Sequence, residues 1–349
     1  MTESTILRYD RSGMRKTLFD FSTQVEEAMQ IGSTARIAID GSAIRNIVVT
    51  GLGGSAIGGD LLRSYLMGDL RIPFIINRHY FLPEFVNERT LVIVSSYSGS
   101  TEETISAHLD AKKRRAKVLC ISSGGETSRL ASKFKQPLIT IPKGYPPRAA
   151  LGYSFFPMLI AFQRMKLIKP RAGDIRETVT LLKRKAKVYS SLEPEKSLAL
   201  HAARQLYGKI PVVYSAADRF DVVNLRWRGQ LGENSKVLAF GNVLPEMNHN
   251  ELVGWRVLQR QMQDIAVLFL HDKGDNERVK IRMDVTKGIV SEFASRIIDL
   301  HSEGKSLLSR MFSLIYLGDW TSYYLAILNG IDPTPVKVID YLKWELEKR

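Results

Sequence analysis

The chain has 349 residues, which is long for a single hydrophobic core and favours about two domains. Hydrophobic residues make up 44% of the chain and charged residues 25%, a composition typical of a soluble globular protein with ample apolar material for a core. The formal net charge of +14 allows a nucleic-acid partner. However, the densest basic runs, 112–115 and 183–185, lack interleaved aromatic side chains, so we expect a solvated basic surface and no nucleic acid.

Signals for export and for membrane insertion are not found. No apolar run reaches the roughly 18 residues of a membrane-spanning helix, and the best one, 151–162, is broken by Pro157. Residues 1–10 lack the apolar core of a signal peptide, and the single Cys120 cannot form a disulfide within the chain. We therefore expect a cytoplasmic location and no membrane partner.

The first part of the chain predicts one helix followed by a repeated strand–turn–helix pattern. Apolar side chains at helical spacing over 18–29 predict a helix that packs against the first domain. From residue 46, apolar runs without period-2 alternation predict buried strands at 46–50, 74–76, 91–94, 118–121 and 138–141, with the clearest helix at 101–115. Strands of this kind favour a parallel sheet that is covered by helices on both faces.

A second cycle of the same kind follows the linker candidate 169–173, with predicted strands at 211–214, 237–240, 265–270 and 297–300. The predicted fold is therefore α/β, with two subdomains that each contain a parallel sheet flanked by helices in three layers. We place the domains at 1–155 and 156–349, although the halves are too dissimilar in sequence to be called a repeat.

The glycine-rich turn after the first strand nominally matches a dinucleotide-binding fingerprint. The match consists of Gly51, Gly53 and Ala56 in the spacing Gly-x-Gly-x-x-Ala. A dinucleotide site usually has an acidic residue at the end of the next strand, but Asn77 and Arg78 stand there. Arg78 is compatible with the 2′-phosphate of a dinucleotide, which keeps that ligand as a minor alternative. The glycine match alone is weak, however, and we do not expect a dinucleotide.

The run from Ser95 to Thr104 joins a strand to a helix through a loop that is rich in hydroxyl groups. Side-chain hydroxyls at a helix N-terminus, where backbone N–H groups are unpaired, favour binding of an anion. Ordinary N-capping is the alternative; it accounts for Thr101 but leaves Ser96 and Ser98 without a role. The pattern therefore predicts a phosphate site.

With the glycine-rich turn, this loop resembles the sugar isomerase (SIS) domain, and the whole chain from residue 46 resembles the bifunctional phosphoglucose/phosphomannose isomerases of that superfamily. The resemblance is dense at 51–60, 95–104, 146–153, 226–250 and 332–343, and departs from the usual pattern at Ser100, where the family usually has Asn. It implies two SIS-type subdomains and a hexose 6-phosphate as substrate. The residues that it implies for substrate binding are Gly54, Ser55, Ser96, Ser98 and Thr101.

The resemblance also implies two residues that act on the sugar. Arg148 lies in a Pro-Arg-Ala-x-Leu motif, and a fixed guanidinium there would stabilise an enediolate oxygen, although a lone arginine is more often a surface residue. Glu233 matches the base of the family's Glu-Asn motif; the bland alternative is a solvated helix carboxylate. Trp227 and Leu231 make its helix face partly apolar. A poorly hydrated carboxylate is a stronger base, which favours abstraction of a proton next to a carbonyl.

Three further residues are implied by the resemblance alone. His249 would assist ring opening from the neighbouring subunit, which implies a homodimer. Thr334, otherwise a plain N-cap, would lie beside C1 and C2 and leave room for the C2 epimer, and Lys343 on the last helix would reach the site. The six histidines show no His-x-His or His-Glu-x-x-His spacing, so we expect no metal and no cofactor.

These expectations describe an isomerase that interconverts glucose 6-phosphate, and mannose 6-phosphate, with fructose 6-phosphate through a cis-enediolate. A sugar-phosphate sensor on the same domain is one alternative; it would keep the serine loop but need neither Glu233 nor His249. Such regulators usually add a helix-turn-helix, for which the residues before 46 leave little room. An isomerase of another sugar phosphate is the second alternative, and the motifs separate it less well.

Overall fold

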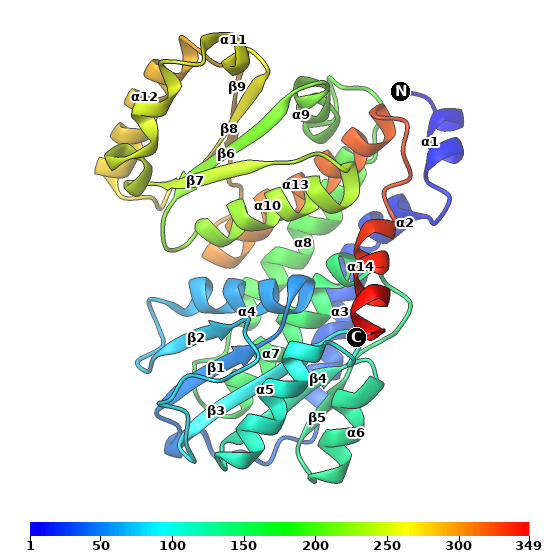
Figure 1. The fold of residues 1–349 in the computed structure, drawn as a ribbon, viewed down its shortest axis with the longest axis vertical. Coiled ribbons are helices and arrows are strands. Elements are labelled where there is room, and N and C mark those ends of the chain that lie inside the picture. Colours follow the sequence, from blue (N-terminus) through cyan, green and yellow to red (C-terminus); the bar gives the residue numbers. More distant parts are fainter. Residues whose placement is uncertain (349) are drawn as a thin grey trace. The chain divides into compact units, whose positions relative to one another are not determined.

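The computed structural model describes residues 1–348, which form two compact units (Figure 1). The first unit comprises residues 20–180, and the second comprises residues 1–19 together with the chain from 181 onward. Each unit has its own parallel sheet and its own helices. The predicted α/β class with two helix-flanked parallel sheets is therefore confirmed.

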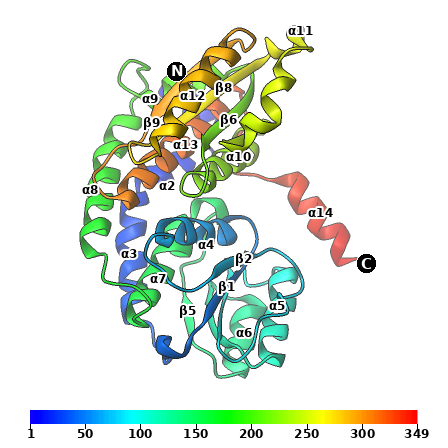
Figure 2. The same ribbon diagram turned by 90° about the vertical axis from the view of Figure 1, so that its left-hand side faces the viewer.

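The first unit contains a five-stranded parallel sheet in the order β2-β1-β3-β4-β5. The strands are β1 (Asn46–Thr50), β2 (Phe74–Asn77), β3 (Thr90–Ser96), β4 (Lys117–Ser122) and β5 (Leu138–Thr140). Figure 2 shows α3 (Phe21–Thr34) and α7 (Leu151–Arg164) on one side of this sheet, and α5 (Glu102–Lys113) and α6 (Gly125–Lys133) on the other. The helix α4 (Gly53–Leu66) packs on α7, so β1 and β3 are buried on both faces.

The second unit contains a four-stranded parallel sheet in the order β7-β6-β8-β9. The strands are β6 (Ile210–Ala216), β7 (Phe240–Leu244), β8 (Ile265–His271) and β9 (Arg296–His301). Helices α9 (Leu198–Leu206), α10 (Asp221–Ser235) and α13 (Leu307–Leu328) pack together. The other elements are α12 (Glu277–Ser291), the short turns η3 (Glu246–His249) and η4 (Glu251–Trp255), α11 (Gln259–Met262) and the last helix α14 (Lys337–Glu347).

A nearly all-buried helix, α13, holds the second unit together. Its tyrosines bind the N-terminal helices α1 (Glu3–Tyr9) and α2 (Met14–Phe19): Tyr316 donates a hydrogen bond to the carbonyl of Leu18 at 2.7 Å, and Tyr323 bonds the carboxylate of Asp10 at 3.1 Å. This is why residues 1–19 belong to the second unit, although they precede the first unit in the chain.

The predicted strands all occur, but some boundaries differ. The unit boundary lies at 180/181, inside α8 (Ala172–Tyr189), instead of at 155/156, because α7 packs on α3 and α4 and so belongs to the first unit. The helix predicted over 18–29 begins at Phe21 as α3, and Leu18 belongs to α2. The strand predicted at 237–240 begins at Phe240, since α10 ends in a left-handed Lys236 and the chain then needs three residues to reach the sheet.

Candidate active site

The predicted phosphate loop lies at the carboxyl end of β3 in the first unit. Ser96 Oγ accepts a hydrogen bond from the backbone N–H of Gly99 at 3.1 Å, and Ser98 Oγ accepts one from the N–H of Ser100 at 3.2 Å. Thr101 is the N-cap residue of α5, yet its side chain makes no capping hydrogen bond and instead contacts Ser96 Oγ at 3.2 Å. The first turn of α5 therefore has no side-chain cap, which disfavours the N-capping explanation of this motif.

The glycine-rich turn at the start of α4 is joined to this loop. The buried Ser55 accepts a hydrogen bond at its Oγ from the N–H of Tyr97 at 3.0 Å. Gly51 must be glycine here, because a Cβ at that position would lie 2.7 Å from the carbonyl oxygen of Ser95. The structure thus brings together Ser55, Ser96, Ser98 and Thr101, as the sequence predicts.

Arg148 lies in the short turn η2 (Pro147–Ala149) of the same unit and is only 3% exposed. A Cβ on Gly54 would lie 2.5 Å from the carbonyl oxygen of Pro147, so the backbone of the glycine-rich turn touches the arginine segment. The amide of Gln24 also donates to the carbonyl of Ala149 at 3.0 Å. Its burial and the fixed backbone argue against an ordinary surface arginine. Gly54 and Arg148 therefore lie at the same edge of the sheet as the hydroxyl-bearing residues of the loop.

Sequence reasoning missed the second glycine turn of this site, Gly124–Gly125, which follows β4. A Cβ on Gly99 would overlap the carbonyl oxygen of Gly124, and Gly99 has a φ of +73°, so only glycine fits there. Tyr97 was also missed; Ser123 donates to its carbonyl at 2.7 Å. Burial raises the pKa of the Tyr97 hydroxyl, which therefore stays neutral. In the sequence, only the pair Gly124–Gly125, which is typical of a tight turn, indicated the contact between this turn and Gly99.

The second unit contributes Glu233, near the C-terminal end of α10. One face of α10 is fixed on α13: the indole of Trp227 donates to the carbonyl of Leu314 at 2.8 Å, and the amide of Asn234 donates to Ser322 Oγ at 3.0 Å. Glu233 is half-buried on another face, where a largely apolar cavity of about 730 Å³ lies. Gly229 and Gly232 line the same cavity, and a Cβ on either would meet nothing within 4 Å. This part of α10 therefore leaves room beside its carboxylate.

The segment that contains Thr334 lies close to Glu233 in the second unit. The ammonium of Lys236 donates to the carbonyls of Glu233 at 2.6 Å and of Pro333 at 3.1 Å. Asp332, whose carboxylate accepts from the N–H of Thr334 at 2.9 Å, lines the cavity. By contrast, Lys343 is exposed on α14 and is not among the residues that line the cavity.

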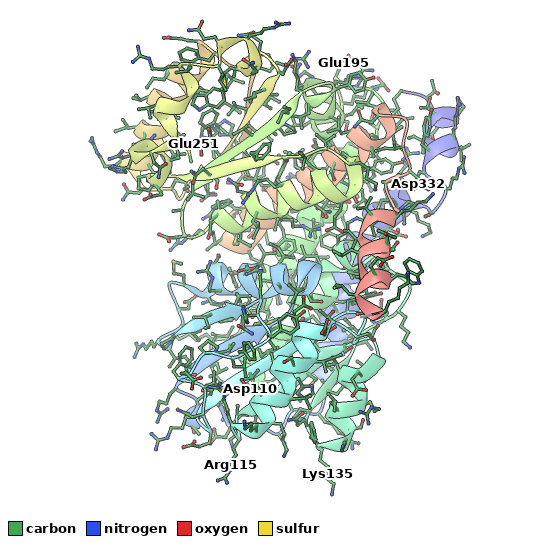
Figure 3. The ribbon with its side chains drawn as sticks, viewed as in Figure 1. Asp110, Arg115, Lys135, Glu195, Glu251 and Asp332 are labelled. Carbon is green, nitrogen blue, oxygen red and sulfur yellow. The ribbon has the colours of Figure 1, made fainter. Side chains whose placement is uncertain are left out.

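His249 lies at the opposite edge of the sheet from Glu233. Helix α10 starts after the carboxyl end of β6 and runs back for 15 residues, or about 22 Å, to the amino edge. Strand β7 then returns to the carboxyl edge, and the exposed His249 ends the turn η3 that follows it. Figure 3 shows Glu251, next to this turn, and Asp332, on the cavity, at opposite ends of the unit. One copy of the second unit therefore does not bring Glu233 and His249 together.

The described residues offer neither a metal cluster nor a membrane span. Within residues 1–348, no group of three or more His, Cys, Asp or Glu side chains has an arrangement that could hold a metal ion. None of the described helices combines the length and the apolar character needed to cross a membrane.

Comparisons with known proteins agree with these features. Residues 195–346 match the family described as bacterial phospho-glucose isomerase C-terminal SIS domain. The chain is 45% identical to the bifunctional phosphoglucose/phosphomannose isomerase of Caldicellulosiruptor bescii, over 95% of this chain and 98% of that protein. It is 37% identical to the enzyme of the same name from Aquifex aeolicus, over 89% and 93%.

Among solved structures, a hypothetical protein of Thermus thermophilus has a similar fold, with a TM-score of 0.78 at 16% identity, over 99% of this chain and 93% of that one. This last likeness concerns the fold alone. On the identity and coverage of the two named enzymes, the chain belongs to the family of bifunctional phosphoglucose/phosphomannose isomerases.

Proposed function

We propose that this chain interconverts glucose 6-phosphate and mannose 6-phosphate with fructose 6-phosphate. The observation that carries the proposal is the 45% identity to a bifunctional phosphoglucose/phosphomannose isomerase over nearly the full length of both proteins. The hydroxyl-lined loop at an uncapped helix start supports a substrate that ends in a phosphate. The half-buried carboxylate in the second unit supports proton transfer, not mere binding.

In this proposal, the first unit holds the phosphate. Hydroxyls of Ser55, Ser96, Ser98 and Thr101 and the backbone N–H groups of the first turn of α5 bind its oxygens. These donors add no full charge, which suits reversible binding of a monophosphate. The guanidinium of Arg148 stabilises the negative oxygen that develops on the sugar.

Glu233 is the proposed base. It removes the proton from C2 of the open-chain aldose, and the electrons of that C–H bond form a cis-enediolate with the C1 carbonyl. Return of the proton to C1, together with transfer of the O2 hydroxyl proton to O1, gives fructose 6-phosphate, whereas return to either face of C2 gives the glucose or the mannose epimer. The adjacent carbonyl acidifies the proton, so this route requires no metal or redox cofactor. Thr334 near C1 and C2 leaves room for both epimers, and Lys343 is retained only as a candidate for contact with the substrate.

The chain is further proposed to act as a homodimer in which His249 assists ring opening in the partner's site. The positions of Glu233 and His249 at opposite edges of one sheet support this, because a site that uses both then needs two copies. Exposed apolar side chains follow His249 closely: Val253 is 76% exposed and Val257 is 84% exposed. Exposed apolar groups of this kind are typical of a subunit interface. The buried free thiol of Cys120 fits the cytoplasmic location that we propose.

The first experiment is a coupled assay of fructose 6-phosphate formation from each aldose, with a chelator present. We expect both aldoses to be converted and the chelator to have no effect. The function is contradicted if neither aldose yields fructose 6-phosphate, and the metal-free route is contradicted if the chelator abolishes turnover. A panel of amino and pentose sugar phosphates in the same assay separates the alternative substrates.

The second experiment replaces the base. Glu233→Gln should reduce turnover by a factor of about 10³ while phosphate binding is kept, because only the proton acceptor is lost. Glu195→Gln is the matched control, since Glu195 is an exposed carboxylate of the same unit, and it should retain full activity. An active Glu233→Gln variant would remove the proposed base and favour a sugar-phosphate sensor.

The third experiment tests the shared site. Glu233→Gln and His249→Ala chains are each expected to be nearly inactive alone. A mixed dimer of the two contains one site with both residues intact if His249 acts across the interface, and none if it acts within its own chain. Co-expression with two different affinity tags, followed by purification of the mixed dimer, should therefore restore up to about half of the wild-type turnover. A mixed dimer without activity contradicts the shared site.

A further inference from the structure

We propose that Lys143, which no motif singled out, supplies the positive charge that attracts and retains the substrate's phosphate. This inference rests on the proposed function, because it assigns the serine loop to a phosphate. The loop itself contains hydroxyls and backbone N–H groups but no cationic side chain between Ser95 and Thr104. A cation on another segment of the first unit would therefore strengthen the binding of a doubly charged phosphate.

Acidic residues beside the loop make such a cation more useful. The first turn of α5 carries Glu102 and Glu103, and the first turn of α6 carries Glu126. Glu126 is paired with Arg129 at 2.6 Å, whereas Glu102 accepts a longer hydrogen bond from the hydroxyl of Tyr80, at 3.4 Å. Carboxylates next to the binding loop repel an incoming phosphate unless a nearby cation offsets them.

The position of Lys143 follows from the packing of two glycine turns. A Cβ on Gly125 would lie 2.6 Å from the carbonyl oxygen of Ser98 and 2.9 Å from Ser100 Oγ, so the Gly124–Gly125 turn lies directly against the serine loop. On its other side, a Cβ on Gly124 would lie 3.1 Å from both the Cε and the Nζ of Lys143. Only one glycine thus separates the lysine ammonium from the loop.

The segment that carries Lys143 is anchored to the same loop. The backbone N–H of Tyr145 donates a hydrogen bond to the hydroxyl of Tyr97 at 2.9 Å, and the rings of Tyr145 and Tyr153 pack edge to face at 5.5 Å between centroids. Gly144, with a φ of +95°, makes the turn between the anchor and the lysine. The backbone is therefore held against the loop, while the side chain of Lys143 remains exposed and able to move.

Lys143 also has no competing partner. Within the described part of the chain, residues 1–348, it forms no salt bridge and no side-chain hydrogen bond, in contrast to Lys185, which is paired with Glu303. An unpaired, exposed ammonium next to an anion site can bind the anion without first breaking an ion pair. Its exposed place beside the Gly124–Gly125 turn, which lies against the serine loop, fits attraction and retention of the phosphate, so we assign Lys143 to substrate binding and not to the proton transfer.

The experiment compares Lys143→Gln with a matched control, Lys117→Gln. Lys117 is exposed on the same unit, but it begins β4 at the amino edge of the sheet, whereas Gly124 follows the carboxyl end of that strand. Both changes remove one positive charge. We expect Lys143→Gln to raise the KM for glucose 6-phosphate by about 3- to 10-fold at low salt with kcat changed less than about twofold. Lys117→Gln should leave both constants unchanged, and Lys143→Arg should keep most of the affinity.

A direct binding measurement separates this inference from the proposed function. Titration calorimetry with inorganic phosphate should show the same weakening in Lys143→Gln, and the difference from the wild type should shrink at about 0.5 M salt, where charges are screened. Equal phosphate affinities of Lys143→Gln and Lys117→Gln would overturn the role of Lys143, even if isomerisation is observed. A wild-type chain that binds phosphate but isomerises nothing would instead overturn the proposed function and leave this comparison valid.

Discussion

The buried ion pair between Arg226 and Asp319 fixes the helix that carries Glu233, and removing it should destabilise the second unit. Arg226 on α10 donates to the Asp319 carboxylate on α13 at 2.9 Å, and the amide of Gln230 donates to the other oxygen at 2.8 Å. Both charged side chains are only 4% exposed. Asp319→Ala therefore removes the carboxylate that accepts hydrogen bonds from the buried guanidinium of Arg226 and from the amide of Gln230.

The expected cost follows from this burial. Breaking a buried pair by removing one partner costs about 3–5 kcal/mol, whereas an exposed pair contributes about 0–1 kcal/mol. The change that replaces both charges, Arg226→Met with Asp319→Leu, removes both members of the pair but still takes away the acceptor of Gln230, a cost of about 1–3 kcal/mol. Addition of Gln230→Leu should recover most of that loss. We therefore expect the wild type and the triple variant to be the most stable, the double variant to be less stable, and Asp319→Ala to be the least stable.

Urea unfolding followed by tryptophan fluorescence measures this effect selectively, because all the tryptophans lie in the second unit. They are Trp227, Trp255, Trp320 and Trp344. With a slope of about 2–3 kcal/mol per molar urea, Asp319→Ala should lower the unfolding midpoint by about 1–2 M. Glu277→Ala is the control, since Glu277 pairs with Lys280 at the surface and is 83% exposed. The reasoning is refuted if Asp319→Ala costs no more than this control.

Three further predictions concern packing and titration. Gly54→Ala should lower kcat/KM by about 10- to 100-fold in the coupled assay, because the new methyl group displaces the Arg148 segment. Gly173→Ala is the control, since a Cβ on Gly173 would have no atom within 4 Å. Gly318→Ala should cost about 1–3 kcal/mol in urea, since its Cβ would lie 2.6 Å from the Trp227 ring. Burial raises the pKa of Cys120 from 9.0 to about 12, so the native thiol should not react with a disulfide reagent at pH 8 but should react in urea. The thiol pKa is higher in the folded chain than in the unfolded chain, so the stabilisation from the buried neutral thiol is fully present below pH 9 and is lost as the pH rises towards 12. The urea unfolding midpoint should therefore fall over this pH range.

The parts of the fold that could be predicted were those encoded by local patterns. Apolar runs such as 91–94 and 265–270 identify buried strands, because a strand covered on both faces has no polar alternation. The unit boundary inside α8 could not be predicted in this way. It depends on which helices α7 contacts and on two tyrosine hydrogen bonds from α13 to residues about 300 positions earlier.

The same distinction holds for the candidate site. The serine loop is a continuous motif, and its residues come together because they are neighbours in the chain. The contact between Gly99 and Gly124 instead depends on the pairing of β3 with β4, which places Ser96 beside Ser122. Likewise, the opposite positions of Glu233 and His249 follow from the strand order β7-β6-β8-β9, which the sequence does not reveal.

The two sheets share a strand order, so the proposed phosphate loop of the first unit has a counterpart in the second unit. In the order β2-β1-β3-β4 and β7-β6-β8-β9, the serine loop after β3 corresponds to the turn after β8, 272–276. There, the buried carboxylate of Asp272 accepts from the N–H of Gly274 at 2.8 Å and from the guanidinium of Arg310 at 2.8 Å, so a side chain of the protein itself already takes up these donors.

The starts of the two corresponding helices differ in the same sense. Asn276 caps α12 by accepting from the N–H of Arg278 at 2.9 Å, whereas Thr101 makes no such bond to α5. A helix start whose donors are satisfied by its own side chain, beside a turn whose donors bind a carboxylate of the same chain, has few donors left for a phosphate. A helix start without a side-chain cap, surrounded by hydroxyls, has donors that an anion can take up. Under the proposed function, the two units thus use one topology differently. The first has a helix start without a side-chain cap at the proposed phosphate site, whereas in the second the start of α12 is capped and α10 carries the proposed base, Glu233.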